Sequence, residues 1–121
     1  MNSTAPWPVS ITYNRAERQL RITFEDGAAF ALPAEYLRVE SPSAEVQGHG
    51  AATKVLVPGK RLVSIRAMEP VGQYAIRIIF DDGHDTGLFS WNYLHELGQQ
   101  QQARWSQYEQ RLREQGLTRD P

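Results

Sequence analysis

Residues 80–83 read Phe80-Asp81-Asp82-Gly83, and they end the most β-rich run of the chain, 74–80. A near copy, Phe24-Glu25-Asp26-Gly27, ends an earlier run in which apolar and polar residues alternate. A carboxylate followed by glycine after such a run is typical of a hairpin turn, because glycine adopts the positive φ that tight turns need. The repeat therefore predicts two antiparallel units, one around each turn.

Most of the segments around these turns alternate apolar and polar side chains, as half-buried strands do. The expected strands are 9–13, 20–24, 28–32, 62–68, 74–80 and 86–89. A short helix is expected at 33–38, since Pro33 suits a first helical turn and Glu35 favours the positive end of the helix dipole. The predicted fold is α+β, with a small antiparallel sheet of about six short strands.

A longer C-terminal helix is expected to begin after Ser90, which is a good N-cap. Two apolar triplets at helical spacing follow it, namely Trp91, Leu94 and Leu97, then Trp105, Tyr108 and Leu112. Gly98 and four glutamines stand between the triplets and predict a kink or break, because glycine inside a helix costs about 1 kcal/mol relative to alanine. Whether the second half packs on the domain or projects from it stays open.

The length fits one domain. A flexible N-terminal arm is expected at 1–8, and a C-terminal helical extension and tail are expected at 98–121. The chain has no cysteine, which excludes disulfides, thiolate metal sites and cysteine nucleophiles. A net charge of −1 predicts no general attraction to nucleic acid. No membrane span and no secretory signal are recognisable, so a cytoplasmic protein is expected.

The second turn concentrates the polar chemistry of the chain, because His84 and three carboxylates fall within 81–85. Oxygen and imidazole groups suit a metal ion, and His49 could join them. Ordinary turn chemistry explains the same residues, since carboxylates beside a glycine turn favour solvent. No Ser/His/Asp spacing and no nucleophile elbow is recognisable, so no catalytic residues are predicted and the chain is not expected to be an enzyme.

Five motifs occur in order: Phe24-x-Asp26-Gly27, Leu32-Pro33-x-x-Tyr36-Leu37-Arg38, Ser41-Pro42-Ser43-Ala44-Glu45, Pro70-Val71-Gly72-x-Tyr74-Ala75 and Phe80-Asp81-Asp82-Gly83-His84-x-Thr86-Gly87. With Trp91 and Tyr93-Leu94, they resemble the DUF971 family, the γ-butyrobetaine hydroxylase-like N-terminal domain, in its stand-alone bacterial form. The resemblance covers about residues 9–97.

The resemblance implies a metal site, because family members hold zinc through three cysteines and one histidine. The cysteine positions match Ser41, Ser43 and Val46 here, and the histidine position matches His84. One imidazole with neutral hydroxyls is a poor zinc site, so no cofactor is predicted. Weak binding of zinc or iron by His84 and its neighbouring carboxylates remains as an alternative.

The resemblance also implies an accessory role, since the family domain precedes oxygenase barrels and is fused to ATPases that carry iron–sulfur clusters. The leading hypothesis is a non-enzymatic module that binds a protein partner in iron–sulfur or oxygenase-linked metabolism. Neither nucleic acid nor a membrane is expected as a partner. The predicted interaction surface consists of Arg38, Asp82, His84, Asp85 and Trp91.

Overall fold

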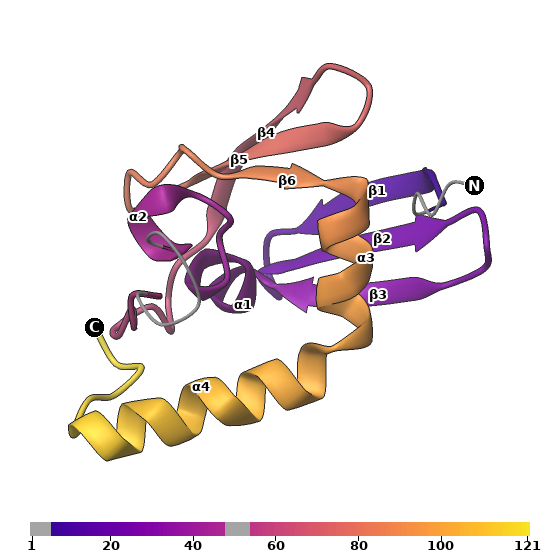
Figure 1. Ribbon diagram of the computed structural model, residues 1–121. Helices are drawn as coiled ribbons and strands as arrows, with labels where there is room; N and C mark the ends of the chain where they lie inside the picture. The colour runs from indigo at the N-terminus through magenta and orange to yellow at the C-terminus, as the bar shows by residue number, and fades with distance from the viewer. Residues whose placement is uncertain (1–5, 48–53) are drawn as a thin grey trace.

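The computed structural model of the chain describes residues 6–47 and 54–121. The described residues form six strands, as expected, but these are divided between two three-stranded antiparallel sheets. The first has the order β1 (Pro8–Asn14), β2 (Gln19–Phe24), β3 (Ala29–Pro33), and the second has the order β4 (Ile65–Val71), β5 (Ala75–Phe80), β6 (Leu88–Ser90). Figure 1 shows β6 reaching from the second sheet toward the first.

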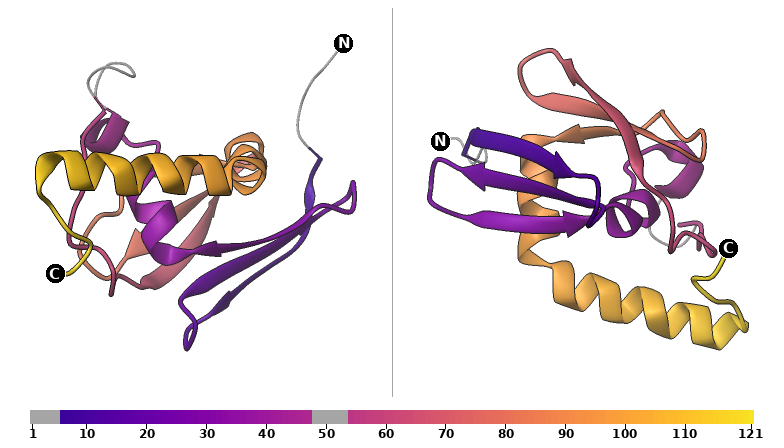
Figure 2. Two further views of the ribbon diagram at one scale, coloured as in Figure 1. Left: turned by 90° about the horizontal axis from the view of Figure 1, so that it is seen from below. Right: turned by 180° about the vertical axis from the view of Figure 1, so that it is seen from behind.

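The helices of the described chain are α1 (Ala34–Val39), α2 (Ala44–Gln47), α3 (Trp91–Gln99) and α4 (Gln101–Gln115). α1 follows β3 directly, so the helix predicted after Pro33 is confirmed. The Ser90 side chain accepts a hydrogen bond from the Tyr93 amide and caps α3, as expected. α3 lies across one face of the first sheet, and α4 leaves its end at a steep angle (Figures 1 and 2). The α+β prediction is confirmed.

The two repeated turns have the same local structure. In each, the glycine amide donates to the phenylalanine carbonyl, and the aspartate side chain accepts from the amide two residues later. The distances are 3.0 Å for Gly27 to Phe24, 3.2 Å for Gly83 to Phe80, 2.9 Å for Ala28 to Asp26 and 3.1 Å for His84 to Asp82. Both glycines have positive φ, +89° and +94°, which confirms the reason for glycine at these positions.

One hydrophobic core lies between the two sheets and helices α1 and α3. Alternate residues of the central strands β2 and β5 enter it, including Ile22 and Ile78, which are almost completely buried. Burying each such side chain contributes about 1.5–3 kcal/mol. The core therefore joins both hairpin units into one body and fixes the second turn against the segment that follows α1.

β4 differs from its expected range, because it starts at Ile65 and continues through Pro70. Pro70 lacks an amide hydrogen, yet β4 is an edge strand with a partner on one side only, so the proline is tolerated there. Within residues 6–47 and 54–121, none of the helices has both the length and the apolar character that a membrane crossing requires.

The helical break lies at Gln100, between α3 and α4, and Gly98 is inside α3. The prediction of a break between the two apolar triplets is therefore confirmed, but glycine is there for a different reason. A Cβ atom at position 98 would lie 2.3 Å from the Phe30 ring. Gly98 lets α3 approach β3 closely enough for Phe30 to pack against it.

Gly98→Ala should lower the free energy of unfolding by about 1–2 kcal/mol, since overpacking costs more than the gain in helix propensity. Thermal or urea unfolding measures this loss. The Phe30→Ala variant removes the ring that causes the clash, so adding Gly98→Ala to it should cost nothing further. An equal cost in both backgrounds would show that the Phe30 contact is not the reason for glycine.

α4 packs on the domain through Tyr108 and Leu112, which are buried against Val39 and the 56–57 segment. The Tyr108 hydroxyl donates to the Val57 carbonyl at 2.6 Å. The chain after α4 turns back, and its backbone hydrogen-bonds to Gly59 and Arg61 (Figure 2). This answers the question that the sequence left open, because the second half of the C-terminal helix does not project.

Candidate functional site

The second turn directs His84 into the protein, toward the segment that joins α1 to α2. Its Nε2 atom lies 2.9 Å from the Ser41 Oγ and 3.3 Å from the Ser43 Oγ, and its Nδ1 atom lies 2.9 Å from a Glu45 oxygen. Both serines and His84 are buried, and the Glu45 side chain is largely exposed. These four residues, Ser41, Ser43, Glu45 and His84, are the histidine cluster below.

The hydrogen bonds of the histidine cluster fix the protonation of the ring. The Glu45 carboxylate can only accept, so Nδ1 carries the proton and Nε2 accepts from a serine hydroxyl. Burial, and then the positive charge of Arg38, lower the pKa of the His84 imidazole below its usual value of 6.5, although Glu45 opposes them. His84 is therefore a neutral, oriented imidazole near neutral pH.

The lowered pKa of His84 makes stability depend on pH in a known direction. The unfolded chain binds a proton at His84 at a higher pH than the folded chain does. The contribution of a neutral His84 is therefore present above about pH 6.5 and is lost as the pH falls from there toward the lower, folded-state pKa. The free energy of unfolding of the wild type should decrease more steeply below pH 6.5 than that of His84→Gln in urea titrations. Parallel curves for the two proteins would contradict this assignment.

Asp82, in the same turn, forms ion pairs with two basic side chains. Its carboxylate accepts from Arg38 Nε at 2.8 Å and lies 2.7 Å from Lys60 Nζ. Burial alone would raise the pKa of this carboxyl, but the hydrogen bonds from Lys60, the His84 amide and Arg38 outweigh burial and lower the pKa to about 2. The turn is thus tied to α1 by an ion pair as well as by the histidine cluster.

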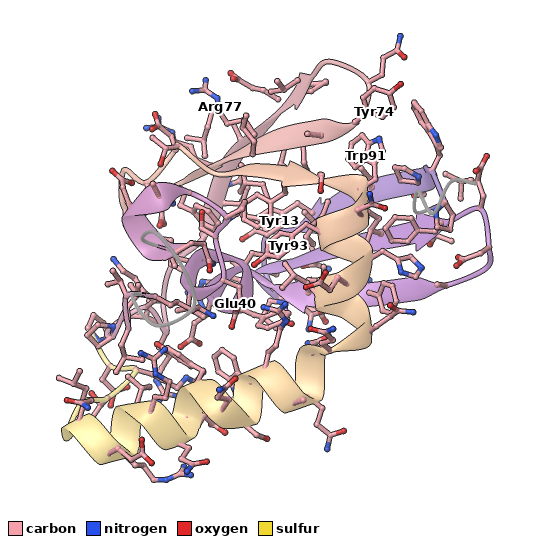
Figure 3. The ribbon with its side chains drawn as sticks, viewed as in Figure 1. Tyr13, Glu40, Tyr74, Arg77, Trp91 and Tyr93 are labelled. Carbon is pink, nitrogen blue, oxygen red and sulfur yellow. The ribbon has the colours of Figure 1, made fainter. Side chains whose placement is uncertain are left out.

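The predicted surface residues do not all lie together. Arg38, Asp82 and His84 meet at the second turn, where the side chains of Arg38 and Asp82 are only 12% and 18% exposed and are paired with each other. Asp85 is exposed beside them. Trp91 is at the far end of β6, where its Nε1 atom donates to the Gln73 carbonyl at 2.9 Å, and Figure 3 shows it close to Tyr74.

The fold brings a serine, a histidine and a glutamate into an arrangement that their spacing in the sequence does not reveal. Ser41, His84 and Glu45 are hydrogen-bonded in the order of a nucleophile, base and orienting acid. However, Ser41 is fully buried, and a Cβ atom at Gly87 would lie 2.4 Å from its Oγ. An acyl substrate has no space beside that hydroxyl, so the arrangement orients His84 and does not expose a nucleophile.

The residues at the implied metal site do not fit zinc. Two of the four positions offer neutral hydroxyls already bonded to His84 Nε2, and the third is Val46, a buried side chain with no donor atom. Across the ranges that the structure describes, no group of three or more histidine, cysteine or acidic residues is placed to hold a metal ion. His49 lies outside the described residues.

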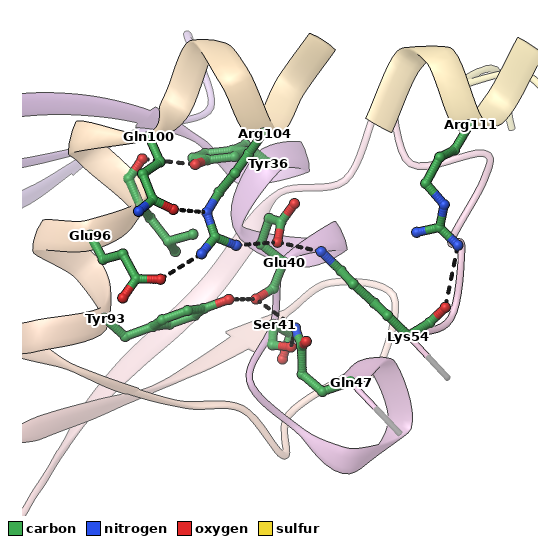
Figure 4. A network of polar contacts seen from close by, with 11 residues as sticks. Tyr36, Glu40, Ser41, Gln47, Lys54, Tyr93, Glu96, Gln100, Arg104 and Arg111 are labelled. Atoms are coloured by element: carbon green, nitrogen blue, oxygen red, sulfur yellow. Dashed lines mark hydrogen bonds and ion pairs between the residues drawn. The ribbon is translucent and has the colours of Figure 1, made fainter. Parts of the chain in front are cut away.

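A second polar network, which the sequence does not reveal, surrounds Glu40 at the end of α1 (Figure 4). The buried Glu40 carboxylate accepts from Lys54 Nζ at 2.6 Å and from Arg104 Nη1 at 2.9 Å. Arg104 also pairs with Glu96, and the Tyr93 hydroxyl donates to the Glu40 carbonyl. A pocket of about 520 Å³ lies beside this network, between α4 and the 54–57 segment. The network joins α1, α3 and α4.

Exposed rings gather near the start of β1 and the tip of the β4–β5 hairpin. The Trp7 and Tyr74 rings are 5.8 Å apart, and their residues are 44% and 65% exposed. The half-buried Trp91 joins them, because its amide donates to the Tyr74 carbonyl at 2.9 Å. Val9 and Val71, next to them in the chain, are also exposed. These five residues are the aromatic patch below.

One family model covers most of the chain. The family described as gamma-butyrobetaine hydroxylase-like, N-terminal, matches residues 11–95. Two proteins with NMR solution structures are 46% and 47% identical to this chain, with TM-scores of 0.84 and 0.86. The first comparison covers 96% of this chain and 91% of the other, and the second covers 100% and 90%.

A more distant structural match carries a family name. It is a crystal structure of a DUF971 protein of unknown function from Acidithiobacillus ferrooxidans, which is 36% identical to this chain. The comparison covers 78% of this chain and 98% of the other, with a TM-score of 0.66. No curated protein matches the chain.

Proposed function

Because the chain belongs to the gamma-butyrobetaine hydroxylase-like N-terminal family, also called DUF971, we propose that it is a non-enzymatic accessory module that binds a protein partner. The aromatic patch is the binding surface. The observation that carries this proposal is the exposure of Trp7 and Tyr74, two large rings that contact each other at the surface. We place the partner in iron–sulfur or oxygenase-linked metabolism, the setting that the family resemblance implies.

The chemistry of the aromatic patch supports protein binding. Tryptophan and tyrosine are enriched among the residues that dominate interface energies, because they bury much apolar area and still offer a polar atom. Clustered apolar side chains at the surface of a small protein often mark an interaction site. Trp91 is already fixed by its bond to Gln73, and the Trp7–Tyr74 contact holds the other two rings, so binding would order few side chains.

The polar groups of the second turn support an accessory role in another way. His84 and Asp82 have internal partners, and Arg38 donates through its Nε atom to Asp82. The buried Nη1 atom of Arg38 has no hydrogen-bond partner among the described residues. A general base or a nucleophile needs access to a substrate, and the buried serine beside His84 has none. These groups therefore contribute to the shape of the domain and leave recognition to the exposed rings.

A paired-variant capture experiment tests the proposal. Tagged wild-type chain, a Trp7→Ser/Tyr74→Ser variant and a Val55→Ser/Leu62→Ser control are each incubated with lysate of the source cell, and bound proteins are quantified by mass spectrometry. Val55 and Leu62 are exposed apolar residues outside the patch. The proposal predicts a protein that wild type and control retain and that the patch variant loses at least tenfold. A bound set that the patch variant leaves unchanged contradicts it.

A further inference from the structure

We propose that the pocket between α4 and the 54–57 segment binds a small organic anion. The anionic group of the ligand lies between Lys54 and Arg111, and a short apolar body lies against Leu56 and Val57. Carboxylates and phosphate monoesters share this chemistry. The inference concerns a different part of the fold from the aromatic patch and does not depend on it.

The pocket has the size and the mixed lining of a small-molecule site. Its volume is about 520 Å³, and such sites usually have volumes of roughly 300–1,000 Å³. Leu56, Val57 and Tyr108 supply apolar surface, and the same side chains pack in the small hydrophobic cluster under α4. Lysine, arginine and glutamine side chains supply the polar part of the lining. This combination suits a ligand with one charged end and one apolar end.

Positive charge is in excess around the pocket. Lys54, Arg104 and Arg111 line it, and Glu40 is the one acidic residue among its described lining residues. One Glu40 oxygen already accepts from Lys54 and from Arg104, and Arg104 also pairs with Glu96. The two carboxylates therefore balance two of the three cations. Arg111 makes no ion pair within the described chain, so its charge has no acidic partner.

Arg111 and Lys54 also have N–H groups available for a ligand. Arg111 reaches from α4 toward the facing segment, where its Nη2 atom makes one long hydrogen bond to the Lys54 carbonyl, at 3.4 Å (Figure 4). Lys54 Nζ uses one of its hydrogens on Glu40. A guanidinium can donate two parallel hydrogen bonds to one carboxylate or phosphate group, and a neighbouring ammonium adds a further donor and a second charge.

The position of these two cations favours an anion over a neutral ligand. Both side chains are half-buried, so solvent and salt screen their charges less than those of exposed cations. Gln107 precedes Arg111 by one helical turn and therefore lies on the same face of α4, and it also lines the pocket. Its side-chain amide provides an additional donor beside the cations. Binding an anion here would connect α4 to the 54–57 segment.

An NMR titration of the full ¹⁵N-labelled chain tests the inference with four probes. Hexanoate and phenyl phosphate are the two organic anions, hexanamide is the neutral analogue, and inorganic phosphate lacks the apolar body. We expect saturable shifts at the amides of 54–57 and of α4, with a dissociation constant of about 1 mM or lower for at least one organic anion. The anion that binds more tightly identifies the anionic group. Hexanamide and inorganic phosphate should bind at least about tenfold more weakly.

Two arginine variants on the same helix show whether the pocket is the site. Arg111→Gln keeps a polar side chain and removes the unpaired charge, so it should weaken binding by about tenfold or more. Arg113→Gln makes the same change in net charge at an exposed residue that does not line the pocket, and it should bind like wild type. The organic anion should raise the melting temperature of wild type and Arg113→Gln, but not that of Arg111→Gln.

Several outcomes would overturn the inference. Neither organic anion giving saturable shifts up to about 20 mM is one of them. Equal weakening in Arg111→Gln and Arg113→Gln would show general attraction to positive charge, and equal affinity for hexanamide would show that the charge is not recognised. Inorganic phosphate binding as tightly as phenyl phosphate would exclude the apolar contact. If Arg111→Gln does not fold, Lys54→Gln provides the same comparison, and unchanged binding in that variant would also contradict the proposal.

Discussion

Replacing Glu40 with alanine should lower the free energy of unfolding by about 3 kcal/mol, since breaking a buried ion pair typically costs 3–5 kcal/mol and its cations here are partly exposed. The Glu40 side chain is 4% exposed and receives Lys54 and Arg104 on one oxygen. Its removal leaves both cations without their shared partner, in a region where α1, α3 and α4 meet. Urea unfolding followed by circular dichroism measures the loss.

Glu96→Ala is the matched control for Glu40, because it removes the other carboxylate bound to Arg104. The Glu96 side chain is 47% exposed, and exposed ion pairs contribute about 0–1 kcal/mol. A cost for Glu96→Ala equal to that for Glu40→Ala would show that burial of Glu40 is not what makes the network stabilising.

Replacing Glu35 with alanine should lower the free energy of unfolding by about 2–3 kcal/mol, since it breaks a two-bond pair of a buried carboxylate with a partly exposed arginine. Arg119 donates to both Glu35 oxygens, at 2.8 and 2.6 Å, and also lies 5.1 Å from the centre of the Trp105 ring. The variant should therefore release the C-terminal tail as well as destabilise α1. Amide hydrogen exchange at residues 117–120, measured beside unfolding, reports the release.

Asp120→Ala is the control for Glu35, because Asp120 pairs with Arg61 next to the same tail but both side chains are well exposed. Asp120→Ala should lower the free energy of unfolding by about 0–1 kcal/mol and leave amide hydrogen exchange at the rest of the tail nearly unchanged. Loss of tail protection in Asp120→Ala but not in Glu35→Ala would contradict the role assigned to the buried pair.

The parts of the fold that depend on local chemistry could be predicted from the sequence. The two carboxylate–glycine turns, the helix after Pro33 and the Ser90 cap each follow from residues next to one another in the chain. The division into two sheets could not be predicted, because it depends on which strands pair over long distances. The role of Gly98 was also hidden, since it follows from a contact with Phe30 in another element.

The candidate site could likewise be predicted from the sequence only in part. His84 and the positions of Ser41 and Ser43 were identified from a family resemblance, but their hydrogen bonds, and the participation of Glu45, needed the fold. Glu40 gives no sign of its importance in the sequence, because an acidic residue after a short helix is usually solvated and its partner Arg104 is 64 positions away. Its burial is a property of tertiary packing alone.

The central claim is that the second turn is closed by a neutral, hydrogen-bonded His84 in place of a metal ion. Long-range ¹H–¹⁵N NMR of the imidazole nitrogens tests this directly, with and without equimolar zinc. The account predicts a single Nδ1–H tautomer, and a ring that is still neutral at about pH 6.5, the usual imidazole pKa. The chemical shifts of its nitrogens should not change when zinc is added. A His84 that is protonated at pH 6.5, or whose Nε2 signal moves on addition of equimolar zinc, would contradict it.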